Sequence, residues 1–238
     1  MGSPLYRDQG VVLRTIKLGE ADRIVTFATQ GHGKVRAVAK GVRKTKSRFG
    51  GRLEPITHLS LQFYEGRELD IVTQAEALDH FRVIREDLDR LARATTMLEA
   101  IDQVAQERQP STRLYQMLVG ALRALAAHNA PLLVPAFFLK LLALEGFQPI
   151  LDGCASCGEP GPLVAFDVGV GGALCPACAR GPRVSEQAVD LMHRILDGGL
   201  AGVLNEPVTP ATSEVANLAT RAMEHHLERR LRSVTVLD

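Results

Sequence analysis

The sequence is poor in aromatic residues and has no long apolar stretch. Tryptophan is absent, and three tyrosines and eight phenylalanines occur among 238 residues. No run of 18 apolar residues exists, which excludes a membrane-spanning helix. Residues 1–10 lack the apolar core of a signal peptide, and Tyr6 stands where a myristoylation signal has serine or threonine. We therefore expect a cytoplasmic protein without membrane association.

Sequence motifs of common enzyme classes are also missing. In the segment Gly31–Lys34, a P-loop would need glycine at position 28 and serine or threonine after the lysine, but the chain has Ala28 and Val35. No dinucleotide-binding glycine pattern, zinc-protease helix motif or serine-hydrolase elbow is present. His225 and His226 lie among Glu and Arg residues, which favours a solvated helix edge over a ligand pair. The sequence thus predicts a protein that is not an enzyme.

Positive charge is concentrated near the N-terminus, although the net charge is only +1. Residues 1–80 carry 13 Lys and Arg against 9 Asp and Glu, whereas residues 151–238 carry 7 against 11. Between residues 34 and 52 there are eight basic side chains and no acidic one. This distribution indicates a local anion-binding surface and not a general affinity for polyanions.

Residues 1–80 have the composition of a small β-structure. Strand-like segments, bounded by glycine-containing turns, cover residues 10–18, 22–29, 34–39, 56–64 and 69–73. Glycines in the turn at residues 30–33 are expected to adopt positive φ. Five short strands predict an antiparallel barrel, with the OB-fold as the first candidate. An SH3-like barrel is the alternative, because strand number alone does not separate the two.

Residues 81–150 have helical periodicity. A first apolar stripe recurs at three- and four-residue steps, which predicts one amphipathic helix face. Its members are Ile84, Leu88, Leu91, Thr95, Leu98, Ile101 and Ala105. A second stripe runs from Leu114 to Leu125, and Ser111 precedes it as a candidate cap.

Three further helices complete the predicted helical domain. Residues 131–145 are apolar on nearly every side, which predicts a buried central helix with Gly146 as its C-cap. Two more helices are expected to begin at Ser185 and Thr209. The helical domain then comprises residues 81–150 and 181–238, and the barrel comprises residues 1–80.

The four cysteines form the strongest local motif. They are arranged as two C-x2-C pairs, Cys154 with Cys157 and Cys175 with Cys178, and a short strand and a glycine turn lie between the pairs. Two such turns can place four sulfurs about 2.3 Å from one Zn²⁺ ion and fill its tetrahedral shell. We therefore expect a zinc-ribbon-like module with one structural ion at residues 151–180, inserted between helices. Buried free thiols, two disulfides and a redox pair are the alternatives.

The basic segment, residues 34–52, is the second signal. Its cations are Lys34, Arg36, Lys40, Arg43, Lys44, Lys46, Arg48 and Arg52. An ordinary solvated face is one interpretation of such a run. The absence of acids, together with a Phe49 that no core requires, favours a flexible loop that binds the phosphates of a nucleic acid strand. Such binding would be salt-sensitive and weakly sequence-specific.

Two long motifs resemble those of the bacterial RecO family of DNA repair and recombination mediators. The first comprises residues 21–27, 31–44, 46–50 and 53–55. The second comprises Gly146-Phe-Gln-Pro149, Cys154-x-x-Cys-Gly158, Phe166-Asp167 and Gly171 through Cys178. The resemblance spans nearly the whole chain, although the middle helices match only in pattern.

This resemblance implies an α+β multidomain chain: an N-terminal OB-fold, an α-helical domain and an inserted four-cysteine zinc module. It implies binding of single- and double-stranded DNA, annealing of complementary strands, and a cytoplasmic, nucleoid-associated location. The implied partners are RecR and single-stranded-DNA-binding protein, with which this family loads recombinase onto coated single strands. A zinc-ribbon protein–protein adaptor is the alternative. A metal-dependent nuclease would need clustered carboxylates near the DNA, and the basic segment has none.

Overall fold

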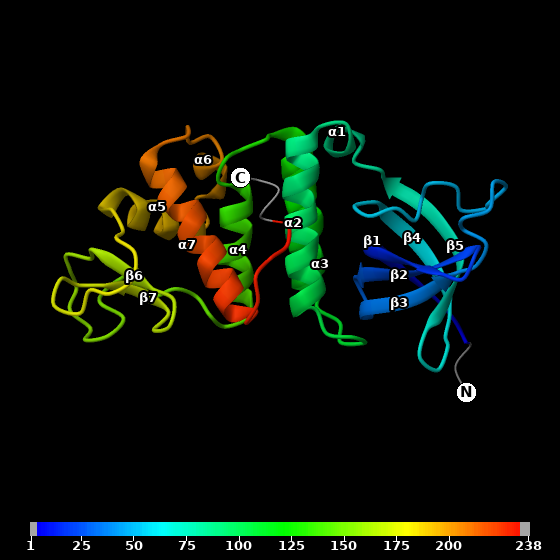
Figure 1. Ribbon diagram of the computed structural model, residues 1–238, viewed down its shortest axis with the longest axis horizontal. Helices are drawn as coiled ribbons and strands as arrows, with labels where there is room; N and C mark the ends of the chain where they lie inside the picture. The colour runs from blue at the N-terminus through cyan, green and yellow to red at the C-terminus, as the bar shows by residue number, and fades with distance from the viewer. Residues whose placement is uncertain (1–3, 234–238) are drawn as a thin grey trace. The chain divides into compact units, whose positions relative to one another are not determined.

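The computed structural model describes residues 4–233 (Figure 1). The outermost parts of the predicted barrel and helical domains, residues 1–3 and 234–238, lie outside the described residues. The described chain forms two compact units, residues 4–126 with Ser233 and residues 127–232. No helix within residues 4–233 is long and apolar enough to cross a membrane.

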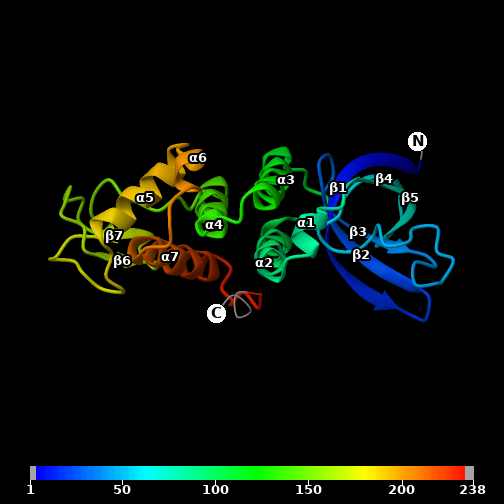
Figure 2. The same cartoon turned by 90° about the horizontal axis from the view of Figure 1, so that it is seen from above.

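The first unit contains a closed five-stranded barrel, as predicted. Its strands are β1 (Leu5–Leu18), β2 (Asp22–Thr29), β3 (Gly33–Ala39), β4 (His58–Tyr64) and β5 (Asp70–Asp79). They pair around the ring in the order β1-β2-β3-β5-β4, and Figure 2 shows the strands encircling one interior. All neighbours are antiparallel except β3 and β5, which are parallel. The barrel is OB-like, and β1 and β5 are longer than the sequence predicted.

The barrel closes because β1 pairs with strands on both of its sides. Its first half pairs with β4 from Leu5 to Val11, and its second half pairs with β2. A register shift between Val12 and Arg14 bends the strand between these halves. Gly10 lies near this bend, where an added Cβ would come 3.1 Å from the Thr29 side chain.

Three helices accompany the barrel in this unit: α1 (Arg82–Arg85), α2 (Leu88–Val104) and α3 (Thr112–Ala127). The predicted first stripe does not belong to a single helix, because α1 ends before Asp87. The Asp87 side chain accepts a hydrogen bond from the Arg90 backbone N–H at 3.1 Å and begins α2 as its N-cap. Leu88 and Thr95 are consequently exposed, whereas Leu98 is buried. The predicted second stripe is buried, and Ser111 accepts a hydrogen bond from the Leu114 backbone N–H.

The second unit is a helical bundle that carries a small hairpin. Its elements are α4 (Leu133–Leu144), β6 (Ala165–Asp167), β7 (Gly172–Leu174), α5 (Glu186–Leu196), α6 (Leu200–Val203) and α7 (Pro210–His226). Helices α4, α5 and α7 pack on one another, and α4 is buried along most of its length. The predicted caps are confirmed: Ser185 and Thr209 accept backbone hydrogen bonds, and Gly146 has φ +87° after α4. The short helix α6 had no predicted counterpart.

The two units divide the helices differently from the organisation predicted above. The sequence places all helices in one domain, because periodicity shows that a segment is helical but not what its apolar face covers. In the structure α1 and α2 belong with the barrel, and the boundary falls at the end of α3. The predicted domain boundaries at residues 80, 150 and 180 stay a prediction, because compact units are not the same as independently folding domains.

Candidate nucleic-acid interface and metal centre

The basic loop, residues 40–57, connects β3 to β4 and is fixed by its own apolar residues. Phe49 is 2% exposed and Leu53 is 1% exposed, and both belong to the core of the barrel. The expectation that no core requires Phe49 was therefore wrong. Successive turns also close the loop backbone, through the bonds from Lys44 N–H to Gly41 O and from Ser47 N–H to Lys44 O. The cations are thus carried by an anchored loop and not by a flexible one.

Two of the eight predicted DNA-binding cations, Lys34 and Arg36, are paired with acidic residues of the same unit. The Lys34 Nζ donates to the Asp102 backbone carbonyl at 2.6 Å and lies 3.8 Å from the Asp102 carboxylate. The Arg36 guanidinium lies 3.6 Å from the Glu107 carboxylate. We expect Lys34, whose side chain is 16% exposed, to contribute little to phosphate binding, whereas a phosphate can displace the more exposed carboxylate of the Arg36–Glu107 pair.

Gly33 explains why the acids come so close to β3. It has φ +66°, and an added Cβ would lie 2.0 Å from the Gln109 carbonyl oxygen. The chain at residues 106–109 therefore packs directly on the start of β3, where the Lys34 N–H donates to the Gln106 carbonyl at 3.1 Å. Sequence reasoning predicted the positive φ but not the contact, because the partner lies more than 70 residues further along the chain.

Three arginines of the basic loop brace the backbone around it. Arg43 donates to the carbonyls of Gly19 and Glu20 in the β1–β2 turn. The Arg48 guanidinium lies 4.7 Å from the centre of the Phe49 ring and donates to the Val72 carbonyl at 3.3 Å. Arg52 completes the set and donates to carbonyls within the loop. These hydrogen bonds use neutral acceptors, so no carboxylate offsets the charge of these arginines.

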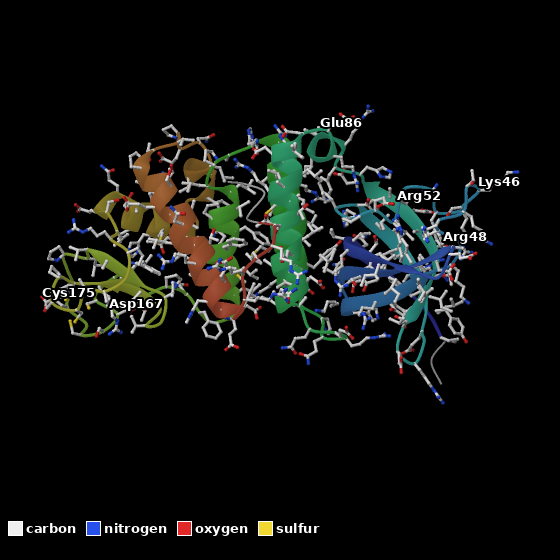
Figure 3. The ribbon with its side chains drawn as sticks, in the orientation of Figure 1. Lys46, Arg48, Arg52, Glu86, Asp167 and Cys175 are labelled. Atoms are coloured by element: carbon white, nitrogen blue, oxygen red, sulfur yellow. The ribbon has the colours of Figure 1, made fainter. Side chains whose placement is uncertain are left out.

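The remaining three cations, Lys40, Lys44 and Lys46, are exposed and without partners. None of their side chains makes a hydrogen bond or ion pair with another described residue. Figure 3 shows Lys46 extending away from the barrel, with Arg48 and Arg52 at the same barrel end. An exposed ammonium group without a carboxylate neighbour is available to a phosphate. The loop therefore presents three free and three bracing cations.

The second unit brings the four predicted metal ligands together. All four cysteine sulfurs lie within 4.8 Å of one another, and Cys157 and Cys175 Sγ are 3.7 Å apart. A disulfide needs about 2.05 Å, so these are free thiols. A tetrahedral ion with metal–sulfur bonds of about 2.3 Å places its ligands about 3.8 Å apart. The cluster therefore has the dimensions of a site for one metal ion.

Local hydrogen bonds shape this cluster. In the first turn, the Gly158 N–H donates to the Cys154 carbonyl at 2.8 Å, and Gly158 has φ +80°. In the second turn, the Cys178 N–H donates to the Cys175 carbonyl at 3.1 Å. The Ala155 N–H donates to the Ala173 carbonyl in β7 and so ties the first turn to the hairpin. The predicted strand, glycine turn and return strand between the cysteine pairs are confirmed as β6 and β7.

The thiols of the cluster titrate unequally. Backbone hydrogen bonds, the largest from Cys175, lower the pKa of Cys154 to about 6. The backbone N–H of Glu159 acts to lower the pKa of Cys157, but contacts with the other three thiols outweigh it and raise the pKa to about 12. Four thiolates at these distances repel one another unless a cation lies between them. The cluster is thus suited to a divalent ion and has no open position for substrate.

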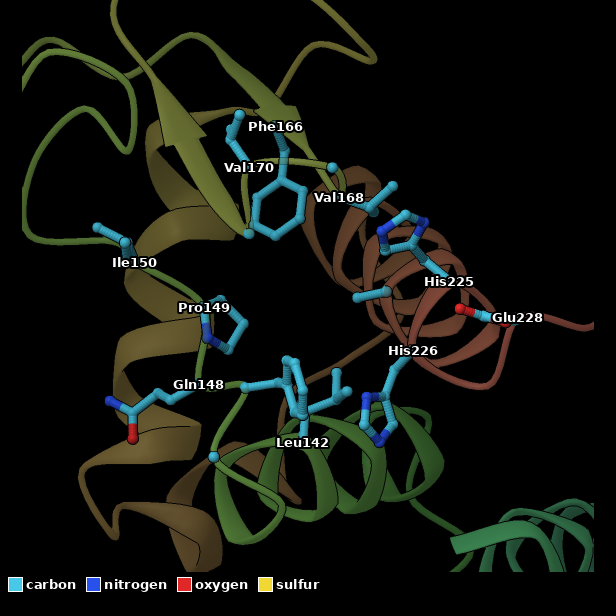
Figure 4. A pocket seen from close by; sticks show the side chains of 15 residues that line it. Leu142, Gln148, Pro149, Ile150, Phe166, Val168, Val170, His225, His226 and Glu228 are labelled. Carbon is cyan, nitrogen blue, oxygen red and sulfur yellow. The ribbon is translucent and has the colours of Figure 1, made fainter.

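The second unit also contains a pocket of about 560 Å³ that sequence reasoning missed (Figure 4). Its walls come from the end of α4, the segment after it, the β6–β7 turn and the end of α7. His225 and His226 line it, and the His226 ring lies 4.4 Å from the Phe147 ring. Among the described residues, only the four cysteines form a group that could hold a metal ion. The pocket brings together residues 142–150 and 222–228, which are too far apart in the sequence for a local pattern to show.

Together these features define an OB-fold protein with a cationic barrel loop and, in its second unit, a four-cysteine metal module. A family model described as "Recombination protein O N terminal" matches residues 1–81, and one described as "Recombination protein O C terminal" matches residues 85–235. The DNA repair protein RecO of Frankia casuarinae is 45% identical over 241 residues, which cover 99% of both chains. The chain belongs to the RecO family, and its role lies in DNA repair and recombination.

Proposed function

We propose that this protein binds single- and double-stranded DNA through the basic loop and anneals complementary strands. The observation that carries the proposal is the set of three exposed lysines, Lys40, Lys44 and Lys46, which have no partner among the described residues. They lie on a loop that Phe49 anchors in the barrel core. Family membership supports a DNA ligand over other polyanions.

The proposed mechanism is electrostatic and needs no bond chemistry. Two complementary strands repel each other because each carries a charge on every phosphate. Cations on the loop would neutralise some phosphates, lower this repulsion and leave the bases free to pair. Phe49 is buried, so it offers no stacking platform, and phosphate contacts would lead the binding. The protein would act as a mediator without nucleotide hydrolysis and not as an enzyme.

The metal in this proposal is one structural Zn²⁺ ion held by Cys154, Cys157, Cys175 and Cys178. Four sulfur ligands with these spacings fit Zn²⁺, and they leave no position for a catalytic water. When bound, the ion would supply only cross-linking of the two cysteine turns. Metal analysis of the purified protein tests this assignment: we expect one zinc per chain, whereas another metal or none would contradict it.

The proposed partners are RecR and single-stranded-DNA-binding protein, with which this protein would help to load recombinase onto coated single strands. Support comes from family membership. The proposal assigns no residues of this chain to either partner surface.

Fluorescence anisotropy with a labelled single strand and a labelled duplex tests DNA binding. We expect both to bind, with an affinity that falls as salt increases. Folded protein that binds neither DNA at 50 mM salt would contradict the proposal and favour the protein–protein adaptor.

A further inference from the structure

A second cationic feature lies beside the basic loop in the first unit. It is an open pocket of about 440 Å³, which we call the arginine pocket. One wall is the backbone and side chains of residues 49–52, and the other wall is His80, Arg82 and Arg85. The pocket is thus lined by three arginines and one histidine, and no acidic residue lines it. Arg82 and Arg85 lie outside the basic segment that the sequence singled out.

The guanidinium groups of the pocket have capacity left for a ligand. Arg85 donates through Nε to the His80 carbonyl and through Nη2 to Pro55 and Thr57, but its Nη1 has no partner within residues 4–233. Burial lowers the pKa of Arg85, and the Glu54 carboxylate acts in the opposite direction. A guanidinium that has lost hydration gains from an anionic partner. Arg52 bonds only to backbone carbonyls and keeps its charge.

The walls of the arginine pocket are held by two residues in a conformation that side chains rarely adopt. Ile56 has φ +76° and Phe81 has φ +45°, and both are almost fully buried. A β-branched residue at positive φ is strained, and such residues gather at functional sites. Arg85 bonds to residues on both sides of Ile56 and joins the strained turn to α1. The position of Arg85 is therefore built into the fold.

One pocket arginine, Arg82, is paired with an acidic side chain that competes with a ligand. Arg82 is 83% exposed and its Nε lies 2.6 Å from the Glu86 carboxylate, an i,i+4 pair across α1. An exposed pair of this kind adds little stability, so a phosphate can displace the carboxylate. Figure 3 shows Glu86 at α1, at the top of the view.

We propose that the arginine pocket binds a phosphodiester group of DNA, so that a strand on the basic loop continues past Arg52 to Arg82 and Arg85. The inference rests on the proposed function and extends its DNA site beyond the basic segment. The ligand is an oxyanion in a strand, because bidentate guanidinium groups match phosphate geometry and the glycine backbone at residues 50–51 lets it approach closely. Phe49 lies beneath the pocket and does not stack on a base, since its ring is buried.

Two substitutions of the same ion pair test the inference in opposite directions. Arg82→Gln removes one phosphate contact, so we expect the salt dependence of single-strand binding to become shallower by about 0.7 in log–log slope. Between 50 and 200 mM salt, the Arg82→Gln variant should therefore lose about 2.6-fold less affinity than the wild type. Glu86→Gln removes the competitor and should tighten binding roughly two- to fivefold. If the ion pair had only a structural role, both substitutions would change DNA binding in the same direction.

Arg67→Gln is the matched control, since Arg67 is an exposed arginine in the β4–β5 turn without a partner among the described residues. Circular dichroism of each variant confirms that the barrel is folded. Two results would overturn the arginine pocket but leave the proposed function standing, provided that the wild type binds DNA. One is an Arg82→Gln variant whose DNA binding is indistinguishable from that of Arg67→Gln. The other is a Glu86→Gln variant that binds DNA more weakly than the wild type. Wild-type protein that binds no DNA would overturn both.

Discussion

Replacement of the three free lysines of the basic loop should make the salt dependence of DNA binding shallower without changing the fold. The variant is Lys40→Gln, Lys44→Gln and Lys46→Gln combined. All three side chains are exposed and make no hydrogen bond or ion pair with other described residues, so the fold should not change. The bracing arginines, the paired Lys34 and the buried Phe49 stay in place.

The magnitude follows from the number of phosphates released. Each phosphate neutralised on a single strand contributes about 0.7 to the slope of log K against log salt. If each lysine binds one phosphate, the slope of the variant is shallower by about 2.1. Between 50 and 200 mM salt the wild type then loses about eighteen-fold more affinity than the variant.

The assay is a salt titration of anisotropy with one labelled single strand, performed on three proteins. The matched control is Arg7→Gln, Arg67→Gln and Arg113→Gln combined, which removes three exposed positive charges from β1, the β4–β5 turn and α3. The control should keep the wild-type slope, because its charges lie outside the basic loop. Equal slopes for the loop variant and the wild type, or the same change in the control, would refute the assignment of the loop lysines.

Three further predictions concern stability and metal content. Cys154→Ser should lower the zinc content from one ion to none per chain and lower the thermal midpoint of unfolding. The control Ser156→Ala, at an exposed neighbouring position, should change neither quantity. A zinc-free variant of unchanged stability would contradict a structural role for the ion. Phe49→Ala should destabilise the protein by about 3–5 kcal/mol in urea titrations, because it empties a fully buried ring position in the barrel; a cost below about 1 kcal/mol would show that the ring is not core. His58 is buried with its Nε2 2.6 Å from the Tyr115 hydroxyl, and burial lowers its pKa from 6.5. Unfolding free energy should therefore be highest above pH 6.5 and fall as the pH drops toward the lowered pKa, because the unfolded chain takes up the proton first; a His58→Gln variant with the same pH slope would contradict this.

The strands and the metal ligands could be predicted because their signals are local. Alternation over a few residues placed β2 and β3 within one residue of their bounds, and the spacing of the two cysteine pairs placed all four ligands. The eight cations were found as a group, but their states differ: Lys34 bonds to α2, whereas Lys46 is free. A composition count cannot separate a paired cation from a free one, because the partner acid lies far along the chain.

The errors have the same origin. Phe49 is part of the barrel core because the chain folds it back under the β-sheet, and its neighbours in the sequence are polar or glycine. The first helical stripe continued through Asp87, since periodicity does not register that an aspartate can start a new helix by capping it. The arginine pocket joins residues 49–52 to residues 80–85, and only the tertiary fold brings them together.

Annealing of two complementary labelled single strands, without ATP, tests the central claim most directly. The account predicts acceleration by the wild-type protein at 50 mM salt, a weaker effect at 200 mM, and little acceleration by the triple lysine variant. No acceleration by folded, zinc-loaded protein at either salt concentration would contradict electrostatic annealing and favour the adaptor.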